Sequence, residues 1–131
     1  MQKLIHQLNL QDKIFLPGIK KDPFAGIEDA DLLLMGSDYE GSPNVLPEAG
    51  VLGIPVIAFN VPGGINEIIT DGENGLLVNN NDEKAFTIAI EKALQINFDR
   101  DKITDITKNR FSISAAIAKT EALFLLLTRQ H

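Results

Sequence analysis

The order of elements that decides the fold is contained in Asp31–Phe59, DLLLMGSDYEGSPNVLPEAGVLGIPVIAF. An apolar run at Asp31–Met35 ends in a glycine-containing loop, a helical stretch follows at Asn44–Leu52, and a second apolar run occupies Ile54–Phe59. Neither run alternates apolar and polar residues. Continuous apolar runs bounded by Gly, Pro or Asp are typical of strands that are buried on both faces. The stretch therefore predicts a strand–helix–strand unit with parallel strands.

The rest of the chain extends this pattern in both directions. Two more apolar runs, Lys13–Leu16 and Gly75–Val78, predict further strands. Further helices are predicted at Met1–Leu8, Ile65–Ile69, Asp82–Ile96 and Ser112–Arg129. The expected fold is an α/β domain with a partial Rossmann-like parallel sheet and flanking helices. With only about four strands, this sheet is shorter than a complete doubly wound one.

The last predicted helix has an unusual surface. Its final turns, Leu123–Leu127, are apolar on every side, and such a helix needs cover all round. Two explanations stay open: the helix docks on this domain's own core, or its natural partner surface lies outside this chain.

Composition excludes several classes of function. The 131 residues suffice for a single domain, expected to span 1–131. The net charge is −6 and no basic stripe is present, so nucleic acid is not an expected partner. There is no cysteine, and hence neither a disulfide nor a thiolate metal site. We expect no transmembrane segment and no signal peptide.

The loop between the first strand and the following helix is the candidate ligand site. In open parallel sheets, ligands bind outside the carboxyl ends of the strands. Ser42 can be the N-cap, with Pro43 at the first helical position. The amides from Asn44 to Leu46 then lack helical partners and form an anion site suited to a diphosphate. Gly41 would let a ligand approach the backbone closely.

Two carboxylates in this stretch have different expected roles. Glu40 lies at the mouth of the loop, and Glu48 lies about one turn into the helix. A carboxylate at the latter position can accept two hydrogen bonds from a ribose diol. Each also has a simpler explanation, since a glutamate in a first helical turn complements the helix dipole and a loop glutamate is usually solvated.

The spacing Glu40-x7-Glu48 resembles the signature of family 4 retaining glycosyltransferases of the GT-B fold. Its surroundings are also similar to that family, in the order strand, donor loop, helix, strand, glycine loop, short helix and strand. The matching residues are Ala30-Asp31, Glu48-Ala49, Gly53–Ile57, Gly63-Gly64, Glu67–Ile69, Asp71-Gly72 and Asn74–Val78, with a weaker echo at Asn109–Ser112. The resemblance covers roughly residues 13–95 and implies a donor-binding C-terminal domain.

The resemblance implies a role for each matching residue. Glu40 would be the catalytic residue that faces the donor sugar, and Glu48 would hold the ribose hydroxyls. The sugar and the diphosphate would contact the backbone of the donor loop, at Gly41, Ser42, Asn44, Val45 and Leu46. Gly63 and Gly64 would line the same cleft or serve a tight turn. Glu67 is expected to be a cap or a ribose neighbour.

The implied reaction transfers a sugar from a UDP- or GDP-linked donor with retention at the anomeric carbon. No metal or other cofactor is expected. The acceptor site and the basic residues that neutralise the diphosphate would come from parts of the enzyme upstream of Met1, including a separate N-terminal domain. This chain alone is therefore expected to be inactive. The implied location is cytoplasmic and compatible with peripheral contact at the inner face of the membrane, in polysaccharide biosynthesis.

The sequence departs from the family pattern at two positions. Pro47 stands where the family usually has an apolar residue, and proline in a helix lacks an N–H and clashes with the preceding turn. The helix would then begin later, near Asn44, with Pro47 in its first turn, which changes the amides that face the phosphates. Gly36 stands where the family often has proline.

Other functions are weaker alternatives. Asp29-Ala30-Asp31 resembles a metal-binding Asp-x-Asp triplet, but Asp31 runs straight into a buried strand. His6 and His131 lie at opposite chain ends, so a zinc site is not expected. A glycosidase needs two carboxyls about 5 to 10 Å apart across one sugar bond, which a ribose-facing Glu48 does not satisfy. A non-catalytic nucleotide-sugar-binding or interaction module remains open.

Overall fold

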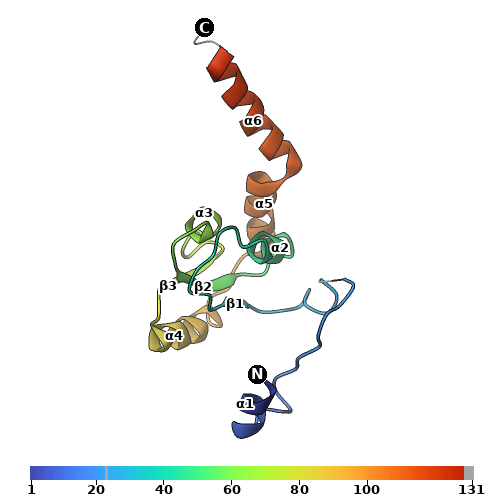
Figure 1. Cartoon of the computed structure of the whole chain (residues 1–131), viewed down its shortest axis with the longest axis vertical. Helices are drawn as coiled ribbons and strands as arrows, with labels where there is room; N and C mark the ends of the chain where they lie inside the picture. The colour runs from blue at the N-terminus through green and yellow to red at the C-terminus, as the bar shows by residue number, and fades with distance from the viewer. Residues whose placement is uncertain (23, 129–131) are drawn as a thin grey trace.

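The structure, a computed structural model, describes residues 1–22 and 24–128. Its helices are α1 (Gln2–Gln7), α2 (Val45–Val51), α3 (Ile65–Ile68), α4 (Glu83–Ala93), α5 (Arg100–Phe111) and α6 (Ile113–Thr128). Its strands are β1 (Leu33–Met35), β2 (Val56–Asn60) and β3 (Gly75–Asn79). Figure 1 shows the sheet at the centre, with α1 and α6 extending away from it.

The three strands form one parallel sheet in the order β1-β2-β3. Val56 of β2 is level with Leu33 of β1 on one side and with Gly75 of β3 on the other. The predicted strands at Asp31–Met35, Ile54–Phe59 and Gly75–Val78 are thereby confirmed in type and order. The expected α/β class, with a partial Rossmann-like parallel sheet, is confirmed as well.

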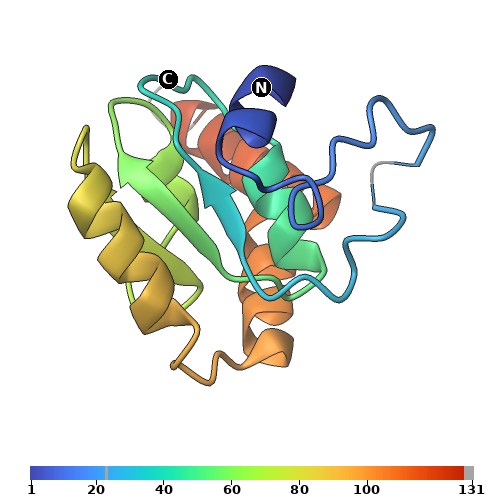
Figure 2. The same ribbon diagram turned by 90° about the horizontal axis from the view of Figure 1, so that it is seen from below.

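Helices cover both faces of this sheet. The α4 helix packs on β2 and β3, and α2 packs against β2 on the opposite face (Figure 2). The α5 helix packs against α2, on the side of α2 that faces away from the sheet. On the α4 side, the rings of Phe59 and Phe86 lie 4.8 Å apart, centroid to centroid. The first four residues of β2, Val56–Phe59, are all buried, as a strand covered on both faces requires.

The α5 helix was not predicted, because its sequence is mostly polar. Only Ile103 and Thr107 are buried along its 12 residues. Its ends do carry the signals of a helix: the Asp99 carboxylate accepts from the Lys102 amide at 3.0 Å, and Lys108 and Arg110 occupy the last turn. Capping chemistry would therefore have found this helix where apolar periodicity did not.

The predicted strand at Lys13–Leu16 is wrong. The amides of Lys13 and Ile14 donate to the carbonyl of Leu10 in a local turn, at 3.0 and 2.9 Å. Pro17 has no N–H to give to a sheet. Because the amides of Lys13 and Ile14 are bonded within the turn and Pro17 has none, the segment forms no strand. The Phe15 side chain is 77% exposed.

Helix α6 leaves its apolar surface exposed. None of its residues is buried, and Leu123–Leu127 are each more than half exposed. The stretch Arg100–Thr128, which comprises α5 and α6 with the extended Ser112 between them, is long and apolar enough to cross a membrane by length and composition only. One such helix is weak evidence for a span. Lys119 and Glu121 lie within this helix, and a lysine at the bilayer centre costs roughly 2.5–3.5 kcal/mol.

We predict that Gly50→Ala destabilises the protein by about 1–3 kcal/mol through overpacking. A methyl group on Gly50 would lie 3.1 Å from the β-carbon of the buried Thr107, at the contact between α2 and α5. Urea denaturation of Gly50→Ala, Thr107→Ala and the double variant measures the coupling between the two positions. The double variant should be more stable than the sum of the single changes predicts, and strict additivity would contradict the contact.

A second stability prediction concerns Asn74, a buried residue just before β3. Its side-chain oxygen accepts from the Thr70 amide at 2.7 Å, and its side-chain nitrogen donates to the Ile68 carbonyl at 3.0 Å. Asn74→Asp replaces this donor with an acceptor that faces another carbonyl, and should cost about 1–3 kcal/mol of unfolding free energy. The exposed Asn80→Asp is the matched control, and equal losses in the two variants would refute the assignment.

Candidate functional site

Two loops meet at the edge of the sheet where the strands end. One follows β1 and carries Glu40 and Gly41, and the other follows β2 and carries Gly63 and Gly64. The parallel strands direct both loops to the same edge. This is the edge at which open α/β sheets bind ligands.

The two loops touch through their backbones. A β-carbon placed on Gly63, whose φ is +123°, would overlap the carbonyl oxygen of Glu40. The Gly64 amide donates to the Gly41 carbonyl at 3.3 Å, and a β-carbon on Gly64 would lie 3.2 Å from the same oxygen. The structure therefore brings the predicted residues Glu40 and Gly41 together with Gly63 and Gly64.

The start of α2 differs from one expectation and agrees with another. Ser42 is not the N-cap and Pro43 is not helical, because the helix begins at Val45 with Asn44 as its N-cap. The reason is Pro47: in a helix starting at Pro43, residue 47 would have to donate to the Pro43 carbonyl, which proline cannot do. The late start near Asn44, with Pro47 in the first turn, is what the structure shows.

This later start determines which amides are available to a ligand. The Leu46 amide donates to the Pro43 carbonyl at 3.1 Å, so Leu46, buried to 1% exposure, has no free N–H group. Across residues 1–22 and 24–128, nothing accepts a hydrogen bond from the amides of Gly41, Ser42, Asn44 or Val45. Four of the five predicted loop positions thus retain a donor, and Leu46 does not.

Glu40 and Glu48 lie in different surroundings. Glu40 is half-buried in the loop, with its carbonyl against Gly63. Glu48 is the fourth residue of α2 and lines a cavity of about 240 Å³. The other residues lining that cavity are apolar: Phe24, Ile27, Ala30, Leu32, Leu33, Val45, Ala49 and Ile54. A carboxylate at the mouth of an apolar cavity can bind a hydroxyl group while the cavity receives a flat or apolar group.

The other residues considered from the sequence take no part in the contact between the two loops. Glu67 is exposed in the first turn of α3, where its backbone amide donates to the carbonyl of Gly64 at 3.1 Å. In the part of the chain that the structure describes, no group of three or more His, Cys, Asp or Glu side chains could hold a metal. The side-chain amide nitrogen of Gln11 donates to His6 Nδ1 at 3.0 Å, and His131 lies outside the described residues.

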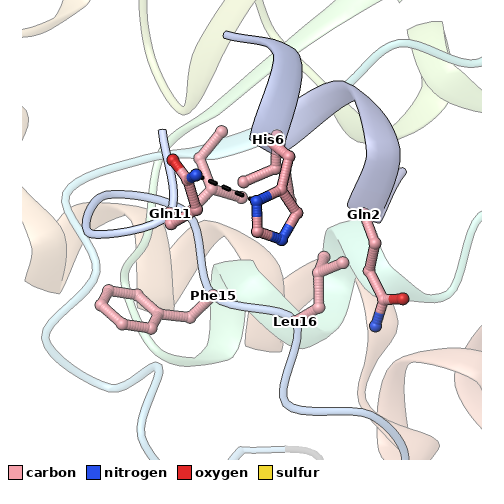
Figure 3. Close-up of a pocket in the computed structure, with 7 residues that line it drawn as sticks. Gln2, His6, Gln11, Phe15 and Leu16 are labelled. Atoms are coloured by element: carbon pink, nitrogen blue, oxygen red, sulfur yellow. Dashed lines mark hydrogen bonds between the residues drawn. The ribbon is translucent and has the colours of Figure 1, made fainter. Parts of the chain in front are cut away.

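A second cavity, of about 270 Å³, is formed by the first 16 residues alone (Figure 3). His6, Gln11, Phe15 and Leu16 line it, and His6 and Gln11 hydrogen-bond across it. No predicted donor-binding residue reaches this cavity, so it is separate from the candidate site.

Comparison with known proteins identifies the family. The family described as "Glycosyl transferases group 1" matches residues 1–110. The chain therefore belongs to the group 1 glycosyltransferases. A putative colanic acid biosynthesis glycosyltransferase, WcaL of Salmonella typhimurium, is 36% identical over 107 residues, which is 76% of this chain and 26% of the relative. Poly(ribitol-phosphate) alpha-N-acetylglucosaminyltransferase of Staphylococcus aureus is 36% identical over 60% of this chain and 16% of the relative.

Solved structures give the same fold. The apo form of the lipopolysaccharide outer core galactosyltransferase WaaB has a TM-score of 0.83 at 22% identity, over 94% of this chain and 36% of that chain. Anabaena HepE in complex with UDP has a TM-score of 0.73 at 26% identity, over 92% of this chain and 35% of that chain. This chain thus spans about a third or less of the relatives it matches.

Gly41 provides a test of the site that leaves the fold unchanged. A β-carbon on Gly41 would meet no atom within 4 Å. Gly41→Val should therefore change the unfolding free energy by less than about 0.5 kcal/mol. It should nevertheless weaken UDP binding in calorimetry, since the side chain fills space beside the free amides. Gly41→Ala should lower the UDP affinity less than Gly41→Val does. An unchanged UDP affinity in Gly41→Val would show that Gly41 does not belong to the binding site.

Proposed function

We propose that this chain is the donor-binding part of a retaining glycosyltransferase that transfers a hexosyl-type sugar from a nucleoside-diphosphate sugar. The observation that carries the proposal is the meeting of the Glu40 loop and the glycine pair at the carboxyl edge of the parallel sheet. Family membership over residues 1–110 supports the reaction class. The UDP bound by the structurally similar HepE supports a uridine nucleotide as donor.

The free amides of the loop suit the charge that this reaction develops. As the sugar leaves, negative charge grows on the departing diphosphate, and fixed N–H groups at that point lower the barrier. The unpaired amides of Gly41, Ser42, Asn44 and Val45 are such donors. They need no metal ion to act, and we propose that the site works without one.

The two glutamates have separate roles in this proposal. Glu40 faces the donor sugar near the reacting carbon and is the proposed catalytic residue. Glu48 accepts hydrogen bonds from the ribose hydroxyls, with the nucleoside against the apolar cavity that this carboxylate borders. The different surroundings of Glu40 and Glu48 support this division of roles over a glycosidase pair that acts on one bond.

The wider setting of the reaction is also proposed. Residues 1–131 form one domain, and a separate N-terminal domain of the same enzyme supplies the acceptor site and the cationic groups. The similarity to a putative colanic acid biosynthesis glycosyltransferase and to a poly(ribitol-phosphate) alpha-N-acetylglucosaminyltransferase supports a role in cell-envelope polysaccharides. We propose a cytoplasmic location with peripheral contact at the inner face of the membrane, as a role in cell-envelope polysaccharides implies.

Calorimetric titration of the chain with UDP, GDP and ADP tests the proposal. We expect weak binding of UDP or GDP. Glu48→Ala should raise the dissociation constant about tenfold or more, because a charge-assisted hydrogen bond is worth about 1.5–3 kcal/mol. The matched control is Glu91→Ala, which removes a carboxylate from the exposed surface of α4 and should leave the affinity unchanged.

The alternative is a non-catalytic module, and the same titration separates the two. Failure of all three nucleotides to bind would exclude a working donor site in this chain and favour an interaction module. Release of reducing sugar from a glycoside at a robust rate would instead favour hydrolysis.

A further inference from the structure

We propose that Gly63 and Gly64 are positioning residues that direct the amides of Gly41 and Ser42 toward the donor. This inference rests on the proposed function for the identity of the ligand. Its structural part, the control of one loop by the other, depends only on contacts between the two backbones.

The direction of the amides follows from peptide geometry. In a planar trans peptide, the C=O of one residue and the N–H of the next point in opposite directions. The carbonyls of Glu40 and Gly41 both face the glycine pair, and the described peptides include no cis bond. The N–H groups of Gly41 and Ser42 must therefore point away from Gly63 and Gly64.

These two amides have no partner in the described part of the chain. No group within the described ranges accepts from the Gly41 or Ser42 amide, and both residues are exposed. A β-carbon on Gly41 would also meet no atom within 4 Å. Two successive N–H groups on one side of a loop make a concave site for anionic oxygens. The diphosphate or sugar of the proposed donor fits this chemistry.

Only glycine permits this arrangement at position 63. Its φ of +123° is rarely adopted by other residues, and a β-carbon there would overlap the Glu40 carbonyl. A side chain would rotate or displace the peptide that joins Glu40 to Gly41. This displacement changes the direction of the Gly41 N–H and the position of the proposed catalytic carboxylate together.

The chain offers a matched set of variants for a test. Gly63→Ala combines backbone strain with a clash against Glu40. Gly64→Ala has no positive φ, and its added carbon approaches the Gly41 oxygen at 3.2 Å. Gly72→Ala is the control, because Gly72 has a φ of +80° but nothing within 4 Å of a β-carbon. Gly72→Ala therefore introduces backbone strain without a new contact, and Gly64→Ala introduces a contact without backbone strain, so the two effects can be measured separately.

The measurements are amide resonances of the labelled full chain by NMR, its melting temperature, and UDP affinity by calorimetry. We expect the Gly41 and Ser42 resonances to move in Gly63→Ala and Gly64→Ala and to stay in place in Gly72→Ala. UDP affinity should fall about tenfold or more in Gly63→Ala and less in Gly64→Ala. Gly72→Ala should lower the melting temperature without changing UDP affinity.

Unchanged Gly41 and Ser42 resonances in both contact variants, or the same shifts in Gly72→Ala, would overturn the inference. If Gly63→Ala does not fold, Gly64→Ala decides the question. If the wild-type chain does not bind UDP, the proposed function fails, while the resonance comparison still decides whether the glycine pair orients the loop.

Discussion

Every strand pairing in the described sheet involves β2. Its backbone bonds to β1 on one side and to β3 on the other, and its residues Val56–Phe59 are buried between helices on both faces. Because the three strands are parallel, the loops that follow them emerge at one edge. The contact of Gly63 and Gly64 with the Glu40 loop is a direct result of this topology. The position of the candidate site thus depends on the burial and pairing of one five-residue strand.

The sequence predicts this central part well. Buried parallel strands are recognisable from uninterrupted apolar runs, and the start of α2 near Asn44 follows from the missing N–H of Pro47. The same residues carry the resemblance to GT-B glycosyltransferases, and the match to the group 1 glycosyltransferases over residues 1–110 confirms it. Fold, family and the order of the loops are all encoded in short-range patterns.

Three features are not predicted by apolar periodicity, each for a different physical reason. Helix α5 is stabilised by packing of Ile103 and Thr107 behind α2, and its own sequence is mostly polar. The apolar run Lys13–Leu16 resembles a strand, but the amides of Lys13 and Ile14 donate to the carbonyl of Leu10 in a local turn and are not available to a sheet. The contact between Gly63 and the Glu40 carbonyl joins residues that are 23 positions apart in the printed sequence, and no spacing within either loop signals it.

The loop that carries Glu40 and Gly41 is held by main-chain atoms, and this has an evolutionary consequence. In the part of the chain that is described, the side chains of Tyr39, Ser42 and Asn44 form no hydrogen bond, and all three are exposed. Their replacement therefore costs the fold little, whereas the glycines behind the loop are constrained. A scaffold of this kind can exchange the exposed side chains of the loop while keeping the geometry of its backbone. If the loop binds the proposed donor, diversification of donor preference is expected to proceed through these exposed side chains, without compensating changes in the core.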